Sequence, residues 1–364
     1  GAIFGSLLLH VYYTSNLIFR QALSDGLKSF TQISGHPLKL PVMKIAFYDQ
    51  LGPAREVLQI GDSICPEPVA GEVRVRVRWS GVNPSDVKSR TGVRMGMPYP
   101  RVIPHSDGMG VVDRVGPGVP PSRLGERVWL WNAARGRAHG SACEWLCLPS
   151  EQAVALPDAA SDEAGACLGV PAITALHSVM MAGGVAGKTV LVAGGAGAVG
   201  HYAVQMASQL GAARVLTTVS THEKEALARS AGADDVIRYK SEPLVESVME
   251  LTGGRGVDRI IELDLATNGT ANLDMLGHFG ECVVYGNTGA NFQLPFYPLL
   301  SKNLQLRFFL VYSLAPEDRR RAIDTLTSML AHGRLQHNIG ARLSLDDIVQ
   351  AHEMIERGEV RSEE

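Results

Sequence analysis

Cysteine is scarce in this chain, and its positions exclude two kinds of stabilisation. Five cysteines are scattered through 364 residues, and no two of them form a Cys-x-x-Cys pair. An odd, scattered set is not the disulfide framework of a small secreted domain, and it does not spell out a structural zinc site. We therefore expect a reducing environment, and the predicted location is cytoplasmic.

An excess of charge of either sign is also lacking. The 34 basic and 37 acidic residues leave a net charge of −3, and 45% of the residues are hydrophobic. This balance excludes a disordered chain, a fibrous repeat and a multi-span membrane protein. It also provides no basic field for phosphate backbones. The sequence thus predicts neither a membrane nor a nucleic acid as a partner.

Acidic residues are almost missing from residues 1–42, where Asp25 is the only one. Organelle presequences are also poor in acids, but they carry scattered arginines, and Arg20 is the only arginine here. The apolar stretch in this segment is too short to span a bilayer. We expect residues 1–42 to be a leader or a disordered extension, and organelle targeting stays open.

The remainder of the chain shows two kinds of hydrophobic pattern, as a length near two domains predicts. Up to about residue 165, apolar residues alternate, as in Val73, Val75 and Val77, which indicates a β-rich lobe. After Pro171, short apolar runs alternate with helical patterns, which is typical of a doubly wound parallel sheet. The expected strands are residues 190–193, 215–219, 235–237, 259–263, 282–285 and 304–310. A closing helical stretch, residues 323–332 and 345–357, is expected to return to the first lobe.

A glycine-rich turn carries the strongest functional signal. Gly195, Gly197 and Gly200 form a G-x-G-x-x-G pattern between an apolar strand and a helix of small residues, which is the context of a dinucleotide-binding turn. We expect Gly195 to make the tight turn and Gly197 to leave room for the pyrophosphate. Gly200 is expected to let the helix pack closely on the strand.

The end of the second strand of this unit indicates which dinucleotide binds. No acidic side chain stands there to accept from a ribose 2′-hydroxyl, whereas Ser220 and Lys224 supply a donor and a cation for a 2′-phosphate. This pattern favours NADPH over NADH. The alternative is that Ser220 and Glu223 form a helix capping box and that Lys224 is a solvated helix residue.

Further motifs of this chain occur together in one known family. They are SGVNPSD (residues 80–86), PHSDGMG (104–110), GVPAITA (169–175) and AGADDVIRY (231–239). With the glycine turn, they resemble the zinc-independent quinone oxidoreductases, the zeta-crystallin-like branch of the medium-chain dehydrogenase/reductase superfamily. The resemblance implies an α/β protein with a GroES-like catalytic domain of residues 43–167 with 313–364, and a Rossmann NADPH-binding domain of residues 168–312.

The resemblance also implies site residues. Asn83 and Thr174 are expected to hold the nicotinamide and to serve catalysis, with Tyr99 as a candidate proton donor. The alternatives are a turn residue before Pro84 for Asn83 and a surface aromatic for Tyr239. The implied cofactor-binding set is Asn83, Thr174, Gly195, Ala196, Gly197, Ala198, Val199, Gly200, Ser220, Lys224, Tyr239, Asn268, Gly286, Asn287 and Phe309.

The positions that match the zinc ligands of metal-dependent relatives are occupied by other residue types. They are Asn83, Ser106 and Val170, which provide neither a thiolate nor an imidazole. We therefore predict no metal. His105 lies one place away from the second of these positions and is expected to be an ordinary polar residue.

The resemblance implies NADPH-dependent reduction of a quinone or another α,β-unsaturated carbonyl compound. An enoyl thioester reductase that uses Tyr99 is one alternative, and a non-catalytic protein that binds NADPH or RNA is another. Homodimerisation through an edge strand near residues 304–311 is implied by the resemblance alone. Relatives continue beyond residues 358–364 into a short apolar strand, so we expect an unpaired sheet edge there.

Overall fold

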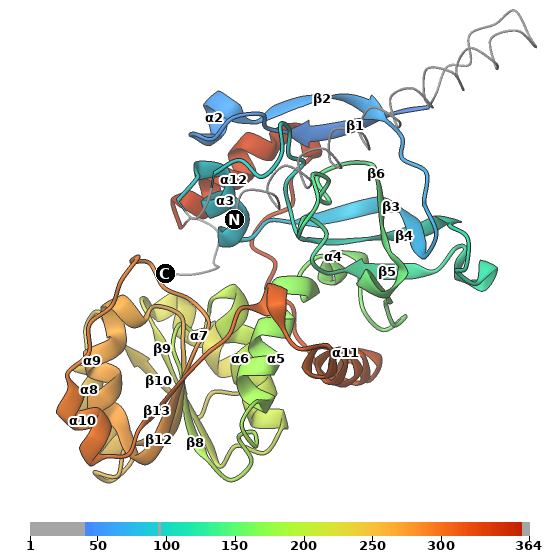
Figure 1. Cartoon of the computed structure of the whole chain (residues 1–364). Helices are drawn as coiled ribbons and strands as arrows, with labels where there is room; N and C mark the ends of the chain where they lie inside the picture. The colour runs from blue at the N-terminus through green and yellow to red at the C-terminus, as the bar shows by residue number, and fades with distance from the viewer. Residues whose placement is uncertain (1–40, 94–95, 359–364) are drawn as a thin grey trace, which may run out of the picture. The chain divides into compact units, whose positions relative to one another are not determined.

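The computed structural model describes residues 41–93 and 96–358 (Figure 1). The predictions for the leader, apart from its last two residues, and for the chain end after residue 358 lie outside the described residues. Within the described ranges, no helix combines the length and the apolar character that crossing a membrane requires.

The first lobe is built from antiparallel strands. A five-stranded sheet has the order β6-β3-β4-β5-β7, and a separate pair joins β1 and β2. Val73 and Val75 are fully buried in β3, as the alternating pattern predicts. The strands are β1 (Val42–Phe47), β2 (Gln59–Ile64), β3 (Glu72–Gly81), β4 (Asp107–Val115), β5 (Arg127–Leu130), β6 (Trp145–Pro149) and β7 (Ala153–Ala155).

The second lobe is a six-stranded parallel sheet in the order β10-β9-β8-β11-β12-β13. All six predicted strands are present. The order reverses between β8 and β11, and ligands of open α/β sheets bind at the carboxyl ends of the strands at such a point. The strands are β8 (Thr189–Val192), β9 (Arg214–Val219), β10 (Asp235–Arg238), β11 (Val257–Glu262), β12 (Leu276–Val284) and β13 (Gln305–Phe308).

Helices cover the second lobe and return to the first (Figure 1). The first lobe carries α2 (Ala54–Val57), α3 (Pro84–Thr91), α4 (Asp162–Gly165) and α12 (Ile348–Glu356). Around the parallel sheet lie α5 (Ile173–Met180), α6 (Ala198–Gln209), α7 (His222–Ser230), α8 (Leu244–Leu251), α9 (Leu265–Met275) and α10 (Phe296–Ser301), and α11 is Pro316–Ala331. Short one-turn segments are η1 (Pro121–Arg123), η2 (Ser150–Gln152), the π-helical η3 (Leu168–Ala172), η4 (Val311–Ser313) and η5 (Leu345–Asp347).

Of the two helices in the closing stretch, only one packs where the sequence predicts. Helix α12 does return to the first lobe, where it packs against α2 and α3. Helix α11 begins earlier than predicted, at Pro316, and packs against α5 instead. The reason is its apolar face, since Ala322, Leu326 and Met329 are buried in the same core cluster as Leu176 of α5.

Candidate active site

The glycine turn lies between β8 and α6, as expected, but the residue that makes its tight turn is not the predicted one. The residue in the left-handed region is Gly194, at φ +68°, and not Gly195. Gly195 is needed for a close approach instead, because a Cβ there would lie 2.0 Å from Thr217 Oγ1. A Cβ on Gly200 would lie 2.1 Å from the carbonyl oxygen of Gly194, so the close packing expected of Gly200 is present.

Helix α6 begins directly after this turn, with Gly197 at its N-cap. The first-turn amides of a helix have no partners within the helix, and together they make a positively polarised site for anions. Ala198 and Val199 contribute the first of these amides. The turn and the helix start therefore fit the pyrophosphate of a dinucleotide.

The end of β9 holds a buried hydroxyl that has no partner. Ser220 is 8% exposed, and its Oγ makes no hydrogen bond within the described part of the chain. The capping box considered for Ser220 and Glu223 is not formed, because the N-cap of α7 is Thr221, whose Oγ1 accepts from the Lys224 amide at 3.4 Å. An unpaired buried hydroxyl costs about 1–3 kcal/mol, which a ligand acceptor would offset.

The other residues implied for the 2′-phosphate stand beside Ser220. Lys224 is half-buried in the first turn of α7. The Tyr239 amide donates to the carbonyl oxygen of Val219, so Tyr239 lies next to the end of β9, where it is 37% exposed. A hydroxyl, a cation and an aromatic side chain thus lie together at the carboxyl end of β9.

Two of the residues implied for the nicotinamide are buried near the lobe boundary. Thr174, in α5, is 3% exposed, and its Oγ1 has no hydrogen-bond partner among the described residues. Asn83 is the N-cap of α3, so it is indeed the residue before Pro84, but its side chain is also fixed: Nδ2 donates to Asp107 Oδ2 at 3.0 Å. Asn83 therefore has a structural role, and the hydrogen bond to Asp107 fixes the orientation of its side chain.

Asp107 holds this part of the site together. Its Oδ2 also accepts from the Val170 amide at 2.9 Å, and Asp86 accepts from the Asn83 amide at 2.8 Å. Burial raises the pKa of Asp107 to about 8 and that of Asp86 to about 7. The Asp107 carboxyl is therefore largely protonated at neutral pH, and it orients Asn83 without placing a full charge there.

A cavity of about 500 Å³ lies between the lobes. Its lining includes Asn83 and Pro84 from the first lobe and Ala198 from the start of α6. Ser80 and His105 line it as well. Asn83 and the start of α6, which directly follows the glycine turn, therefore face the same cavity.

The structure does not bring Tyr99 to this cavity. Tyr99 is half-buried and packs against the core of the first lobe, and it is absent from the cavity lining. A tyrosine that the sequence did not single out lies closer to the site: the Tyr312 hydroxyl is 2.7 Å from Ser85 Oγ, and burial raises its pKa. No local pattern marks Tyr312, because it follows the last parallel strand and meets Ser85 only in the fold.

The remaining implied residues lie at or just beyond the carboxyl ends of β11, β12 and β13. Asn268 Nδ2 donates to the buried Glu262 at 3.0 Å, and a Cβ on Gly286 would lie 2.3 Å from the Leu263 carbonyl oxygen. Two further positions complete the set: Asn287 Oδ1 accepts from the Ala266 amide at 2.7 Å, and the Phe309 ring meets His177 edge-on at 4.7 Å. The amides of Asn268 and Asn287 are thus engaged within the protein.

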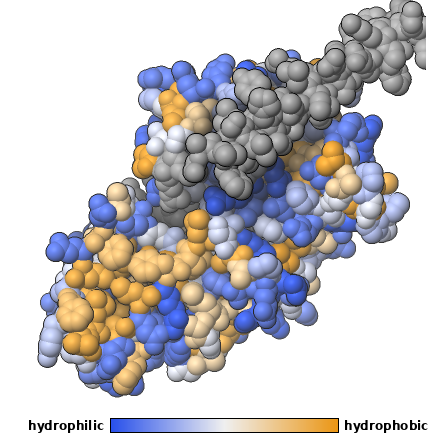
Figure 2. Space-filling view, in the orientation of Figure 1, coloured by the Kyte–Doolittle hydropathy of each residue, from blue (hydrophilic) through white to orange (hydrophobic). Residues whose placement is uncertain are grey.

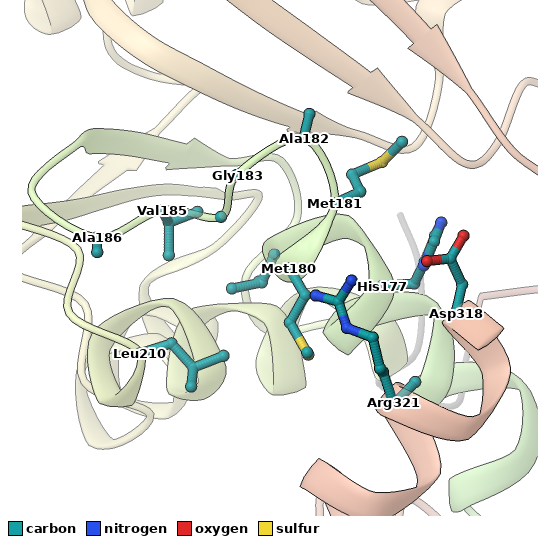
Figure 3. A pocket seen from close by; sticks show the side chains of 13 residues that line it. His177, Met180, Met181, Ala182, Gly183, Val185, Ala186, Leu210, Asp318 and Arg321 are labelled. Atoms are coloured by element: carbon teal, nitrogen blue, oxygen red, sulfur yellow. The ribbon is translucent and has the colours of Figure 1, made fainter.

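A second cavity, of about 660 Å³, lies where the end of α5 and the following loop face α11 (Figure 3). His177 and Met180 from α5 and Asp318 and Arg321 from α11 surround it. None of the implied site residues lines this cavity. It is separate from the glycine turn and from Asn83.

Comparisons with known proteins agree with this arrangement. The sequence model for the alcohol dehydrogenase GroES-like domain matches residues 69–158, and the one for zinc-binding dehydrogenase matches residues 198–328. The quinone oxidoreductase of Salmonella typhimurium is 30% identical over 330 residues, which cover 86% of this chain and 95% of the relative. The chain belongs to the quinone oxidoreductase family of the medium-chain dehydrogenase/reductase superfamily.

Solved structures of this superfamily have the same fold. Quinone oxidoreductase from Escherichia coli in complex with NADPH matches with a TM-score of 0.75 at 27% identity, covering 88% of this chain and 98% of that one. An NAD-dependent alcohol dehydrogenase matches with a TM-score of 0.81 at 27% identity, covering 88% and 98%. The GroES-like lobe and the Rossmann-type sheet of this family member are therefore as the resemblance implied.

The zinc-binding dehydrogenase model matches this chain, but three positions that would hold the metal carry other residue types, Asn83, Ser106 and Val170. Among the described residues, no group of three or more His, Cys, Asp or Glu side chains is arranged to hold a metal ion. Asn83 and Ser106 are buried, and Val170 donates its amide to Asp107. Asn83 and Val170 thus both donate to the Asp107 carboxyl at 3.0 and 2.9 Å.

Proposed function

We propose that this protein uses NADPH to reduce quinones or other α,β-unsaturated carbonyl compounds by hydride transfer without a metal. One observation carries the proposal: a single cavity is lined both by Asn83 and by the start of α6, which follows the dinucleotide-binding turn. A carbonyl acceptor in this cavity would lie against the nicotinamide end of the cofactor. Close, oriented contact between donor and acceptor is the main contribution that a protein makes to hydride transfer.

The chain's own residues divide this work. The amides at the start of α6 would bind the pyrophosphate, and Thr174 and Asn83 would orient the nicotinamide. When bound, NADPH supplies the hydride. The cavity wall is largely apolar, with Val77, Ala166 and Ile355 among its residues, so it would exclude water from the acceptor.

The choice of NADPH over NADH is supported by the end of β9. The Ser220 hydroxyl, which has no partner among the described residues, and the Lys224 ammonium group would bind a 2′-phosphate, and the strand carries no carboxylate at this end. A phosphate with its charge-assisted hydrogen bonds fits such a pair better than a neutral ribose hydroxyl does. The NADPH complex of the Escherichia coli relative agrees with this choice.

We also propose a homodimer through the free edge of the parallel sheet. Figure 2 shows apolar side chains gathered on the surface of the second lobe that carries α10. The exposed residues there include Phe296 and Tyr297 of α10 and Phe308 of the edge strand β13, which are 73%, 74% and 53% exposed. Large contiguous apolar surface of this kind marks a contact with another protein.

The test of the enzymatic proposal is oxidation of NADPH with 1,4-benzoquinone, 9,10-phenanthrenequinone and an enone. NADH and a metal chelator serve as parallel controls. We expect turnover with NADPH, weaker turnover with NADH and no effect of the chelator. Binding of NADPH without turnover of any acceptor would contradict the proposal and favour the enoyl thioester reductase or a non-catalytic role.

A further inference from the structure

The second cavity, between the end of α5 and α11, has the size of a small-molecule site. Its volume of about 660 Å³ lies within the range of about 300–1,000 Å³ that is usual for ligand pockets. Much of its wall is apolar, with Met180 and Met181 at the end of α5 and Val185 and Leu210 from later segments. Methionine side chains adapt to ligands of different shape. This wall therefore fits the hydrocarbon body of a ligand.

One cation in the wall has no partner. Arg321 of α11 lines the cavity, is exposed, and forms no ion pair or hydrogen bond with another described residue. Figure 3 shows its side chain directed from α11 toward Met180. Asp318, one turn earlier on α11, is turned toward His177 instead (Figure 3). The guanidinium group is thus free to pair with an anionic ligand.

A buried arginine supports the wall from behind. Arg259 of β11 is fully buried, and it donates to the carbonyl oxygens of Val179 and Met181 at 2.9 Å each. These carbonyls belong to the C-terminal end of α5, which would otherwise be the negative end of the helix dipole. Because Arg259 satisfies them, the end of α5 does not oppose an anion in the cavity.

The cations behind the wall outnumber their acidic partner. Glu281 of β12 accepts from Arg259 Nη2 at 2.6 Å, and from Lys188 Nζ and Arg307 Nε at 2.8 Å each. Burial works to raise the pKa of Glu281, but the three cations lower it, so the carboxyl is ionised. Three positive charges and one negative charge leave an excess of two. This excess favours an anion over a cation in the adjacent cavity.

The loop after α5 supplies free backbone donors. Ala182, Gly183 and Gly184 line the cavity, and their φ values of +50°, +82° and +75° all lie in the left-handed region. The amides of Ala182 and Gly183 donate to no other described residue. Successive amides in turns of this kind form concave sites for anions. The cavity therefore offers an anion both a positive charge and hydrogen-bond donors.

We propose that this cavity binds a small monocarboxylate with an apolar body, at a site separate from the active site. The carboxylate would pair with Arg321 and the loop amides, and the hydrocarbon body would lie on Met180, Val185 and Leu210. Asp318 would oppose a second negative charge, so a dianion fits less well. The inference goes beyond the proposed function and does not depend on it, because no residue implied for the dinucleotide lines this cavity.

Calorimetric titration of the full chain with octanoate tests the site, with octan-1-ol as the neutral counterpart. We expect one site with a Kd of about 1 mM or below. Octan-1-ol should bind about fivefold more weakly, because it cannot form the ion pair. Octanoate should still bind when the protein is saturated with NADPH. If NADPH abolishes the binding, the anion occupies the acceptor cavity and the proposal is wrong.

Variants of α11 and of the wall locate the anion. Arg321→Gln should weaken octanoate binding about tenfold, because it removes a charge-assisted hydrogen bond. Its thermal unfolding should not change, since the side chain is exposed. Arg320→Gln is the matched control, because it removes an exposed cation that does not line the cavity. Met180→Glu should abolish binding by placing a carboxylate in the wall. Equal octanoate affinities in Arg321→Gln and Arg320→Gln would overturn the proposal.

His177 reports occupancy at the site itself. It lines this cavity, whereas His105 lines the acceptor cavity. Octanoate should shift the ring signals of His177 in NMR spectra of histidine-labelled protein and leave those of His105 in place. Shifts at His105 alone, or no shift and no heat of binding, would contradict the proposal. None of these measurements needs turnover, so a failure of the proposed function is recognised separately.

Discussion

The hydroxyl groups in the two halves of the candidate site are satisfied in opposite ways. On the cofactor side, the buried hydroxyls of Thr174 and Ser220 have no partners in the described chain. On the acceptor side, Ser80, His105 and Ser141 are joined in an unbroken series of hydrogen bonds. The cofactor half is therefore incomplete until a ligand arrives, whereas the acceptor half is organised in advance.

This difference has an energetic meaning. A ligand that satisfies orphaned buried groups binds the folded state alone, and it stabilises that state in proportion to its affinity. Hydrogen bonds that already exist gain nothing from the ligand, but they need no reorganisation when charge develops on an acceptor. Changes on the cofactor side should therefore appear mainly in binding, and changes on the acceptor side mainly in turnover or in its pH dependence.

The largest effect on stability and NADPH affinity is expected from adding a side chain at Gly200, next to the glycine turn. In Gly200→Ala, the new methyl group would lie 2.1 Å from the Gly194 carbonyl oxygen, and backbone cannot move aside as a flexible side chain can. We expect a loss of about 1–3 kcal/mol in unfolding free energy and an NADPH affinity that falls roughly tenfold or more. Thermal unfolding and fluorescence titration measure the two effects.

The matched control for this substitution is Gly96→Ala, where an added Cβ meets no atom of the described residues within 4 Å. It should leave both the unfolding free energy and the NADPH affinity unchanged. Equal NADPH affinity in Gly200→Ala and Gly96→Ala would mean that the turn does not carry the cofactor.

The second effect concerns the buried carboxyl behind Asn83. The pKa of Asp107 is raised to about 8 in the folded protein, so the folded state keeps a proton that the unfolded state loses near its ordinary value of 3.8. Stability should therefore fall as pH rises toward 8. Six histidines with lowered pKa values, His105 among them, act in the opposite direction, and their effect fades as pH rises above their ordinary value of 6.5. Toward pH 8 the effects of the two carboxyls, Asp107 and Asp86, therefore dominate this balance.

Asp107→Asn removes this titration. We expect the downward slope of unfolding free energy between pH 6.5 and 8 to become shallower, with the remainder due to Asp86, whose pKa is raised to about 7. Urea unfolding at several pH values measures the slope. Asp158→Asn, at a fully exposed carboxyl, should leave it unchanged. An identical slope in Asp107→Asn would show that this carboxyl is ionised in the folded protein.

The cofactor half could be predicted from the sequence because its parts are local. The glycine turn is one contiguous motif, and the six parallel strands are short apolar runs that need no knowledge of their neighbours. Even here, the left-handed residue is Gly194 and the helix cap is Thr221, since the exact backbone path depends on the contact with β9.

The acceptor half could not be predicted in the same way. Ser80, His105, Ser141 and His352 are separated by up to 272 positions in the sequence, and only the return of α12 to the first lobe brings the last of them to the others. Spacing along the chain carries no signal for such a contact. The same argument applies to Tyr312, which meets Ser85 across 227 positions.

A smaller effect on the cofactor side is a change of selectivity. Lys224→Ala removes the cation proposed for the 2′-phosphate, so NADPH affinity should fall about tenfold, while NADH affinity should stay the same, because NADH has no phosphate there. Calorimetric titration with both dinucleotides measures the ratio. Lys88→Ala, on α3 of the other lobe, should change neither affinity. If the affinities for NADPH and NADH fall equally, Lys224 has a structural role and does not recognise the phosphate.

The smallest effect on turnover is expected from a substitution on the edge strand β13, which belongs to neither half of the candidate site. Phe308→Asp places a charge in the exposed apolar surface of β13, so it should convert a dimer to a monomer, as measured by light scattering after size-exclusion chromatography. Turnover should change little, because Phe308 is not among the described residues that line the cavity. Val69→Asp, at a position of the first lobe that is 64% exposed, should leave the mass unchanged. A dimer that survives Phe308→Asp would exclude this edge as the interface.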